Sequence, residues 1–384
     1  ALSQQAFCAE DDRGSVSAHR AAAPQKIASV TKLFTTLLAL EAFPLEQTWT
    51  TTFTLSADRL HISGGKDPWF EEEKILALVD ALRSRGVTKL REITFDQDFH
   101  FEDSNLQSFT VLGPQTVTLA LRRYFTPSGR LTTAGLGNRA EALANMTELN
   151  VQFPLPSVGI STQSVRFSAT NPVSAIPGAI VLTHRSRSLK TIIKAMNVYS
   201  KNKIAQNLWD LSSGLIKREE VFARRGIPVK EINLRTGSGL PITTPSRFDN
   251  TASCQAILKL LSAIELRARE LNIEREEIVG LGVDLGTLQD RFRDDLPVKE
   301  AIMAKTGTIR NASTIAGWID ADKPYRFALL NQVSSPASAR IFQDKFISLW
   351  MSYAGSPQAR VYHPVQLYPL DGIFMDQHHT VAHR

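Results

Sequence analysis

The residue pattern changes twice along the sequence, and these two changes place the strongest limit on how the chain can fold. Residues 103–183 consist of short β-prone pieces such as TVTLAL, VQFPL and SVRFSA, separated by Pro, Gly and Asn, whereas the flanking segments carry longer helical and strand patterns. Frequent turn residues of this kind are typical of many short strands. We therefore expect a mixed α/β domain that is interrupted by an inserted, strand-rich module.

Length and charge narrow the classes of protein to be considered. At roughly 150 residues per domain, 384 residues suggest two or three structural units. No apolar stretch approaches the ~20 residues that a membrane-spanning helix needs, so we expect no integral membrane segment. The net charge is +6, but the basic residues are interleaved with acids, as in RARELNIEREE at 267–277. We therefore expect no nucleic-acid partner, although a mild positive field favours substrates that end in carboxylates.

The cysteines and histidines give weak signals. Cys8 and Cys254 allow one disulfide at most, and we favour buried free thiols over a bridge. The C-terminal DQHHTVAHR contains three histidines without a carboxylate partner, so a mobile terminus is favoured over a metal site. We expect no metal and no cofactor. The three histidines are His378, His379 and His383.

Hydrophobic periodicity places the main elements of the flanking segments. Apolar residues between Leu33 and Leu40 cover more than one face of a helix, which indicates a helix buried nearly all round, and Pro44 closes it. Other patterns predict further helices and strands. Helices are expected at 72–86, 188–200, 202–214, 251–266 and 337–353, and strands at 50–62, 91–95 and around AIMAKTGT, TIAGWID and YRFALLNQV.

A serine followed by a lysine three residues later opens the buried helix, in IASVTKLFTT. The pattern occurs three times, at Ser29, Ser63 and Ser200, so it is weak by itself. Residues at i and i+3 share a helix face, which places Lys32 beside Ser29. Burial lowers the pKa of a lysine toward the range of a general base. Ser29 is thus a nucleophile with Lys32 as its base, or simply a helix cap.

Two further motifs favour the catalytic alternative. YSKN at 199–202 holds the chain's one SxN pattern between two predicted helices, and KTGT at 305–308 holds its one KTG on a predicted strand. Alternation along a strand points Lys305 and Thr306 to opposite faces, and Gly307 permits a close backbone approach. Three motifs in this order, each on the expected kind of element, favour a catalytic site over a structural one.

The set SxxK, SxN and KTG resembles the signature of the penicillin-recognising serine enzymes. The sequence is more specifically similar to the class C low-molecular-mass penicillin-binding proteins, the D-alanyl-D-alanine carboxypeptidase and endopeptidase family. The narrower resemblance covers about residues 20–100 and 180–350, and four stretches besides the motifs carry it. These are ISGGKDPWF at 62–70, RTGSGLP at 235–241, GTLQDRF at 286–292 and KTGTIRNASTIAGWI at 305–319.

The resemblance implies an α/β (α+β) fold of the penicillin-binding transpeptidase and β-lactamase type, in which helices flank an antiparallel sheet. The catalytic domain would comprise residues 1–58 and 181–384, and the inserted strand-rich domain residues 59–180. Ser29 and Ser200 are 171 positions apart, which requires an insertion. This insertion looks shorter than is usual for the class, so one module has been lost or reduced.

The resemblance also implies a peptidoglycan DD-peptidase. Lys32 would deprotonate Ser29, and the N–H groups of Ser29 and Thr308 would hold the oxyanion. Ser200 would relay a proton to the leaving amine, and Asn202 would orient the substrate. The implied partners are peptidoglycan stem peptides and β-lactams as covalent inhibitors. The implied location is the periplasm, because peptidoglycan lies outside the cytoplasmic membrane; the signal peptide would already have been removed, since ALSQQAFCAE has neither a basic nor an apolar signal region.

The substrate carboxylate would be bound by Lys305, Thr306 and Thr308. Asp96 is expected to match an acidic residue that contacts the amine of a diaminopimelate side chain in this family, and Arg310 stands where some members place a glutamine. Thr236 and Ile242 depart from the usual aspartate and arginine. Recognition of the stem-peptide side chain is therefore the least defined part of the expected site.

Two other functions share these motifs. A serine β-lactamase needs a rapid deacylation step, for which no glutamate or tyrosine is evident, and the large insertion argues against it. A non-catalytic peptidoglycan-binding or β-lactam-sensing protein would not require Lys32 beside Ser29. The expected enzyme therefore hydrolyses D-alanyl-D-alanine ends as a carboxypeptidase and D-alanyl cross-links as an endopeptidase.

Overall fold

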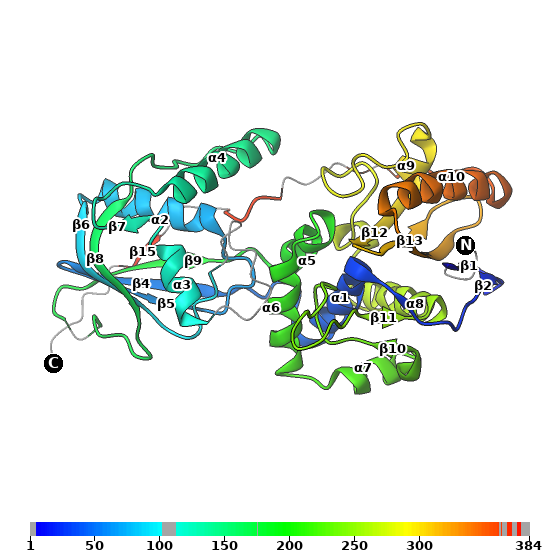
Figure 1. Ribbon diagram of the computed structural model, residues 1–384, viewed down its shortest axis with the longest axis horizontal. Helices are drawn as coiled ribbons and strands as arrows, with labels where there is room; N and C mark the ends of the chain where they lie inside the picture. The colour runs from blue at the N-terminus through cyan, green and yellow to red at the C-terminus, as the bar shows by residue number, and fades with distance from the viewer. Residues whose placement is uncertain are drawn as a thin grey trace. The chain divides into compact units, whose positions relative to one another are not determined.

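The computed structural model describes residues 5–101, 113–174, 176–360, 362, 367–370 and 375–377; the histidine-bearing tail from His378 onward lies outside the described residues. The chain divides into two compact units (Figure 1). The first comprises residues 1–46 and 189–365, and the second comprises residues 47–188 and 366–384. The first unit is therefore discontinuous in sequence.

The unit boundaries differ from the expected 58/59 and 180/181. Strand β4 (Thr50–Ser56) pairs antiparallel with β9 (Ile180–Arg185), so both belong to the sheet of the second unit. This pairing joins residues about 130 positions apart, which no local pattern reveals. The chain consequently enters the second unit at Gln47 and leaves it after Ser188.

The first unit is built on a five-stranded antiparallel sheet in the order β12-β13-β14-β1-β2. The N-terminal strand β1 lies inside the sheet and pairs with β14, whereas β12 forms one edge. An edge strand offers unpaired backbone groups to a ligand. The strands are β1 (Gln5–Asp11), β2 (Val16–His19), β12 (Ile302–Ile309), β13 (Ala312–Ile319) and β14 (Tyr325–Gln332).

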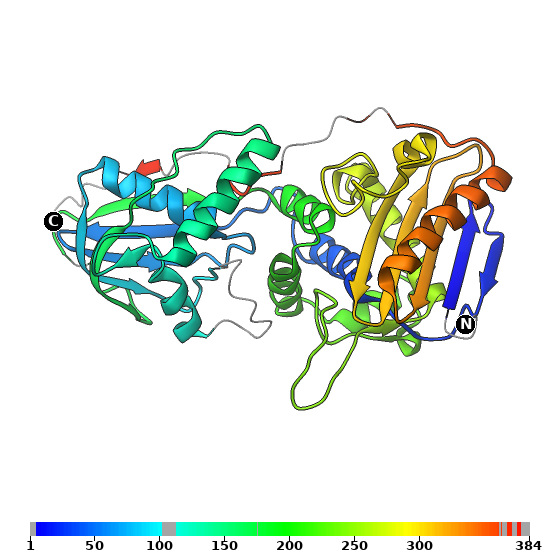
Figure 2. The same cartoon turned by 45° about the horizontal axis from the view of Figure 1, so that its top comes forward.

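Helices cover both faces of this sheet. Helix α10 (Pro336–Ala354) lies across one face, where Ile347 and Met351 pack with apolar side chains of the strands (Figure 2). Helix α8 (Cys254–Glu270) packs on β1 and β14 and also contacts α1 (Thr31–Ala42). The remaining helices of the unit are α5 (Leu189–Val198), α6 (Asn202–Ser213), α7 (Arg218–Arg224) and α9 (Leu296–Ala301), with 3-10 turns at Ala28–Val30, Val229–Glu231 and Arg275–Glu277 and a small sheet of β3 (Gln25–Lys26), β10 (Ile232–Asn233) and β11 (Thr251–Ala252).

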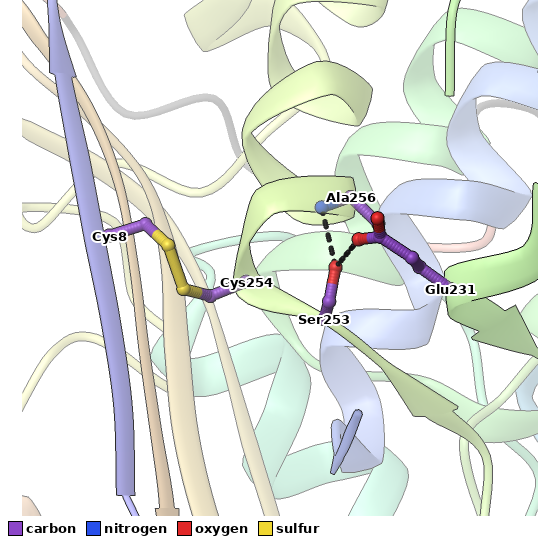
Figure 3. Close-up of a disulfide and its surroundings, with 5 residues drawn as sticks. All are labelled: Cys8, Glu231, Ser253, Cys254 and Ala256. Atoms are coloured by element: carbon purple, nitrogen blue, oxygen red, sulfur yellow. Dashed lines mark hydrogen bonds between the residues drawn. A yellow bond between two sulfur atoms is a disulfide. The ribbon is translucent and has the colours of Figure 1, made fainter. Parts of the chain in front are cut away.

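A disulfide joins Cys8 of β1 to Cys254 at the start of α8, so the prediction of two free thiols is wrong (Figure 3). The two cysteines are 246 positions apart, and only the packing of α8 on β1 brings their Cα atoms to 5.8 Å. Ser253 caps α8 by accepting the N–H of Ala256, and its hydroxyl donates to Glu231 (Figure 3). The helix start that carries Cys254 is thereby fixed in position.

The second unit holds a seven-stranded mixed sheet in the order β15-β9-β4-β5-β6-β8-β7. A buried ion pair between Lys74 and Asp67 lies in this unit, at the SGGKDPWF turn. Its further strands are β5 (Arg59–Ser63), β6 (Lys89–Phe95), β7 (Phe125–Thr126), β8 (Ile160–Phe167) and β15 (Met375–Gln377). Its helices are α2 (Glu72–Ser84), α3 (Pro114–Leu121) and α4 (Thr133–Glu148).

Two of these helices correct the sequence analysis. The segment TVTLAL is not a strand but the body of α3, which starts with Pro114 at its first turn. Helix α4 was not expected, because Gly135 and Gly137 interrupt its pattern; Gly135 lies so close to the Arg123 carbonyl that a Cβ would be 2.6 Å from it. The insertion is therefore mixed α/β rather than mainly β.

Helices of the described ranges are all too short or too polar to cross a bilayer. The expected fold class is confirmed, because an antiparallel sheet with helices on both faces is interrupted by an inserted unit.

Candidate active site

Ser29 lies in the 3-10 turn Ala28–Val30 that runs directly into α1. Ten of the twelve residues of α1 are buried, as the all-round apolar pattern predicts. Val30 occupies the N-cap position of α1 and makes no side-chain cap hydrogen bond. Ser29 is therefore not the cap of this helix, and its role as a nucleophile stays a prediction.

Lys32 lies one turn further along the same helix and is fully buried. Its Nζ is 3.1 Å from Ser29 Oγ, 2.8 Å from Asn202 Oδ1 and 2.8 Å from the Ser238 carbonyl oxygen. Burial lowers the pKa of Lys32 well below its usual value, and the charge of Lys305 lowers it further. A neutral amine can donate to Asn202 and Ser238 and turn its lone pair toward the Ser29 hydroxyl.

The SxN motif reaches this lysine through its asparagine. Asn202 is the first residue of α6, so its side chain projects from the helix start toward α1, which packs against α6. Ser200 lies between α5 and α6 with φ at +58°, a left-handed conformation that is costly for a serine. Asn202 therefore takes part in the hydrogen-bond network of Lys32. Ser200, two positions earlier in the sequence, does not bond directly to Ser29 or Lys32 among the described residues.

The KTG motif lies on the edge strand β12 beside the Ser29 turn. A Cβ on Gly307 would lie 2.9 Å from Ser29 N and 2.8 Å from the Ile27 carbonyl oxygen, so only glycine permits this approach. Thr314 of the neighbouring strand donates to the same Ile27 carbonyl at 2.9 Å. The backbone of β12 is thereby held against the nitrogen of the candidate nucleophile.

Lys305 is fully buried, and its Nζ donates to the Thr306 carbonyl at 3.0 Å. Burial lowers the pKa of Lys305 to about 7. Thr306 is half-buried, and Thr308 is exposed at the end of the strand. Arg310 lies exposed in the two-residue turn between β12 and β13. The predicted carboxylate-binding residues therefore share one strand end.

Asp96 belongs to the second unit, at the end of β6. Its Oδ1 accepts the backbone N–H groups of Gly64 at 2.9 Å and of Asp98 at 3.0 Å, which fixes the SGGK turn. These bonds give Asp96 a structural role within its own unit. Its contact with a substrate side chain stays a prediction.

The segment RTGSGLP supplies contacts that the sequence analysis did not assign to the site. The Ser238 carbonyl accepts from Lys32, and the Gly237 carbonyl accepts from Thr35 at 2.8 Å. Asn250 holds the segment by donating to the Thr236 carbonyl at 2.7 Å. The resemblance of this segment to a stretch of the family indicated that it belongs near the site. Its contacts with Lys32 and Thr35 could not be predicted, because backbone carbonyls make them and every residue has one.

Comparisons with known proteins place this arrangement in a family context. A sequence model described as D-Ala-D-Ala carboxypeptidase 3 (S13) family matches residues 9–110 and 136–348. No curated protein matches this sequence. The motif segments of Ser29, Lys32, Ser200, Asn202 and Lys305 all lie within the matched ranges.

Solved structures share the fold over nearly the whole chain. A predatory endopeptidase from Bdellovibrio bacteriovorus in complex with an immunity protein is 19% identical, with a TM-score of 0.79, over 97% of this chain and 99% of that one. A second predatory endopeptidase from the same organism is 23% identical, with a TM-score of 0.77, over 95% and 97%. Penicillin binding protein 4 from Haemophilus influenzae is 16% identical, with a TM-score of 0.60, over 91% and 96%. Both units of the chain therefore have counterparts in known folds.

Proposed function

The chain belongs to the D-Ala-D-Ala carboxypeptidase 3 (S13) family of serine-type hydrolases, and we propose that it cleaves peptidoglycan stem peptides through an acyl-enzyme on Ser29. One observation carries this proposal: the buried, deprotonation-prone Lys32 has its Nζ 3.1 Å from Ser29 Oγ. A purely binding pocket has no need for a base at this position. The bonds to be cleaved are the D-alanyl-D-alanine end and the D-alanyl cross-link.

In the first step, the neutral Lys32 amine takes the proton of Ser29 as Oγ attacks the carbonyl carbon of the scissile amide. The backbone N–H groups of Ser29 and Thr308 are proposed to stabilise the oxyanion. The contact of Gly307 with Ser29 N supports this pair, because it places the strand beside the nucleophile. A donor of this type typically contributes ~3 kcal/mol to the barrier reduction.

In the second step, the carbon–nitrogen bond breaks and the leaving amine takes a proton from Lys32, relayed through the Ser200 hydroxyl. The acyl-enzyme then reacts with water, which releases the peptide acid and restores the Ser29 hydroxyl. Asn202 orients the substrate amide and keeps Lys32 in place through the 2.8 Å bond. The substrate lies along the edge of β12 beyond Ala304, where an extended peptide can add as a further strand. Nearer the strand start the edge is already paired, since the N–H of Ala304 donates to the Gly280 carbonyl.

Lys305, Thr306 and Thr308 are proposed to bind the carboxylate beside the scissile bond. Arg310 is proposed to contact the stem-peptide side chain, with the departures at Thr236 and Ile242 altering that preference. The natural substrate lies outside the cytoplasmic membrane, and we propose the periplasm as the site of action. The disulfide between Cys8 and Cys254 supports an oxidising compartment.

Intact-protein mass spectrometry after brief exposure to benzylpenicillin tests Ser29. A relative from Bdellovibrio bacteriovorus has been solved in a penicillin G-acylated form, and a β-lactam is expected to acylate this chain too. Wild type and Ser63→Ala should gain one penicillin, whereas Ser29→Ala should gain none. Ser63 is the matched control because it also precedes a lysine by three residues. An adduct on Ser29→Ala, or none on wild type, would overturn the proposal.

Two further measurements separate the remaining functions. Release of D-alanine or of split cross-linked dimers from purified muropeptides distinguishes the carboxypeptidase reaction from the endopeptidase reaction. An acyl-enzyme that persists for minutes is expected of a penicillin-sensitive peptidase, whereas loss of the adduct within seconds would indicate a β-lactamase.

A further inference from the structure

We propose that Arg340 of α10 is a specificity-determining residue, whose guanidinium binds the substrate carboxylate together with Thr308. This inference rests on the proposed acyl transfer at Ser29 and identifies how the substrate end is recognised. It adds to the site a residue that lies outside the SxxK, SxN and KTG motifs.

The faces of β12 place Thr308 between the reaction centre and α10. Ile302 and Ala304 pack with Ile347 and Met351 of α10, so strand alternation turns Thr306 and Thr308 to that same face. Gly307 turns to the opposite face, against Ser29 N. Arg340 Nη2 donates to Thr308 Oγ1 at 3.1 Å. The guanidinium of Arg340 is therefore bonded to the residue that directly follows Gly307, the glycine in contact with Ser29.

Arg340 has hydrogen-bonding capacity to spare. Its guanidinium carries five N–H groups, and the bond to Thr308 uses one of them. Within the part of the chain that the structure describes, no carboxylate forms an ion pair with Arg340. Asp344, one turn further along α10, is instead paired with Arg291 at 2.6 Å. Arg340 thus presents an unneutralised fork of donors beside the strand end.

The hydroxyl of Thr308 is oriented by this contact. Because Oγ1 accepts from Arg340, its own proton is free to point away from the arginine. A carboxylate placed beside both groups would accept one bond from the Thr308 hydroxyl and a charge-assisted, bidentate pair from the guanidinium. Planar carboxylates match the planar guanidinium fork better than they match a lysine ammonium.

The charges of the site explain why an arginine is needed. Burial lowers the pKa of Lys305 to about 7, and burial also lowers the pKa of Lys32. At neutral pH Lys305 is therefore only partly charged, and burial disfavours the charged form of Lys32. An exposed arginine stays charged under all these conditions, so Arg340 supplies the permanent positive charge that a carboxylate requires.

Acylation by benzylpenicillin and by its neutral methyl ester tests this inference. In Arg340→Gln, the second-order rate of acylation by benzylpenicillin should fall roughly 10- to 100-fold, as expected for the loss of a charge-assisted bond, while the rate with the ester changes less than about twofold. Arg340→Lys should retain an intermediate rate. Lys345→Gln removes one charge from another exposed position of α10 and should leave both rates unchanged.

The outcomes separate this inference from the proposed function. If wild type is acylated but Arg340→Gln reacts normally, or loses equal rate with both probes, Arg340 does not recognise the carboxylate and Ser29 remains the nucleophile. If wild type reacts with neither probe, the acyl-transfer proposal fails and the role of Arg340 fails with it. Thermal unfolding of each variant checks folding, and Arg340→Lys carries the test if Arg340→Gln does not fold.

Discussion

Gly239 lies so close to Ala28 that a Cβ on this glycine would be 1.9 Å from the Ala28 carbonyl oxygen. Gly239 has φ at +80°, and Ala28, the residue before Ser29, has φ at +47°. Two left-handed residues thus meet where the segment RTGSGLP touches the turn of the nucleophile. The position of Ser29 depends on this contact as well as on its own helix.

The substitution Gly239→Ala should therefore have a larger effect on the rate of acylation of Ser29 than on the stability of the fold. The added methyl group must push the Ala28 carbonyl away, and misplacing a nucleophile by ~1 Å costs roughly 100-fold in rate. The measurement is the rate of acylation by benzylpenicillin, together with the thermal unfolding midpoint.

Gly14→Ala is the matched control for this prediction. Gly14 has φ at +81° but nothing within 4 Å of its Cβ position, so alanine there meets only the backbone strain of about 1 kcal/mol. Gly14→Ala should keep the wild-type rate. Equal rates for both variants would show that the contact with Ala28 does not position Ser29.

The parts of the candidate site that consist of short local motifs could be predicted from the sequence. Ser29 with Lys32, Ser200 with Asn202 and Lys305 to Thr308 are short motifs, and each lies on the kind of element that the local pattern predicts. Helix α1 was predicted because burial on all sides leaves an apolar pattern that is readable from the sequence.

The features that were missed depend on distant parts of the chain or on the backbone. The Cys8 to Cys254 bridge joins residues 246 positions apart, and the Ser238 carbonyl that holds Lys32 has no side chain to mark it. Nothing in the local sequence distinguishes Arg340 from the other arginines, because its bond to Thr308 forms only when α10 packs beside β12. Such relationships are fixed by tertiary packing, which local propensity does not encode.

The pKa of Lys305, lowered to about 7, predicts a pH dependence for substrates that carry a carboxylate. Below this pH Lys305 is charged and attracts the carboxylate; above it Lys305 is neutral and the attraction is lost. The ratio kcat/KM, which reports on the free enzyme, should therefore fall above about pH 7 to a lower plateau that Arg340 maintains. Loss of the proton from Lys32, whose pKa burial lowers, should raise the ratio.

A substrate without a carboxylate separates the two lysines in this profile. With a D-alanyl-D-alaninamide peptide the rise due to Lys32 should persist, and the fall near pH 7 should disappear. The profile is measured as initial rates of amine release between pH 5 and pH 10. A fall at the same pH with the amide substrate would show that Lys305 is not its origin.

The disulfide between Cys8 and Cys254 should contribute most of its stabilisation by restricting the unfolded chain. It ties β1 to α8 and closes a loop that contains the entire segment 47–188, so its removal should lower the free energy of unfolding of the first unit by about 2–5 kcal/mol. Urea denaturation of wild type and of the Cys8→Ala/Cys254→Ala variant, with and without dithiothreitol, measures this difference. Reductant should move the wild-type transition toward that of the variant and leave the variant unchanged. Coincident transitions for oxidised wild type and the double variant would mean that packing of α8 on β1 suffices without the bridge.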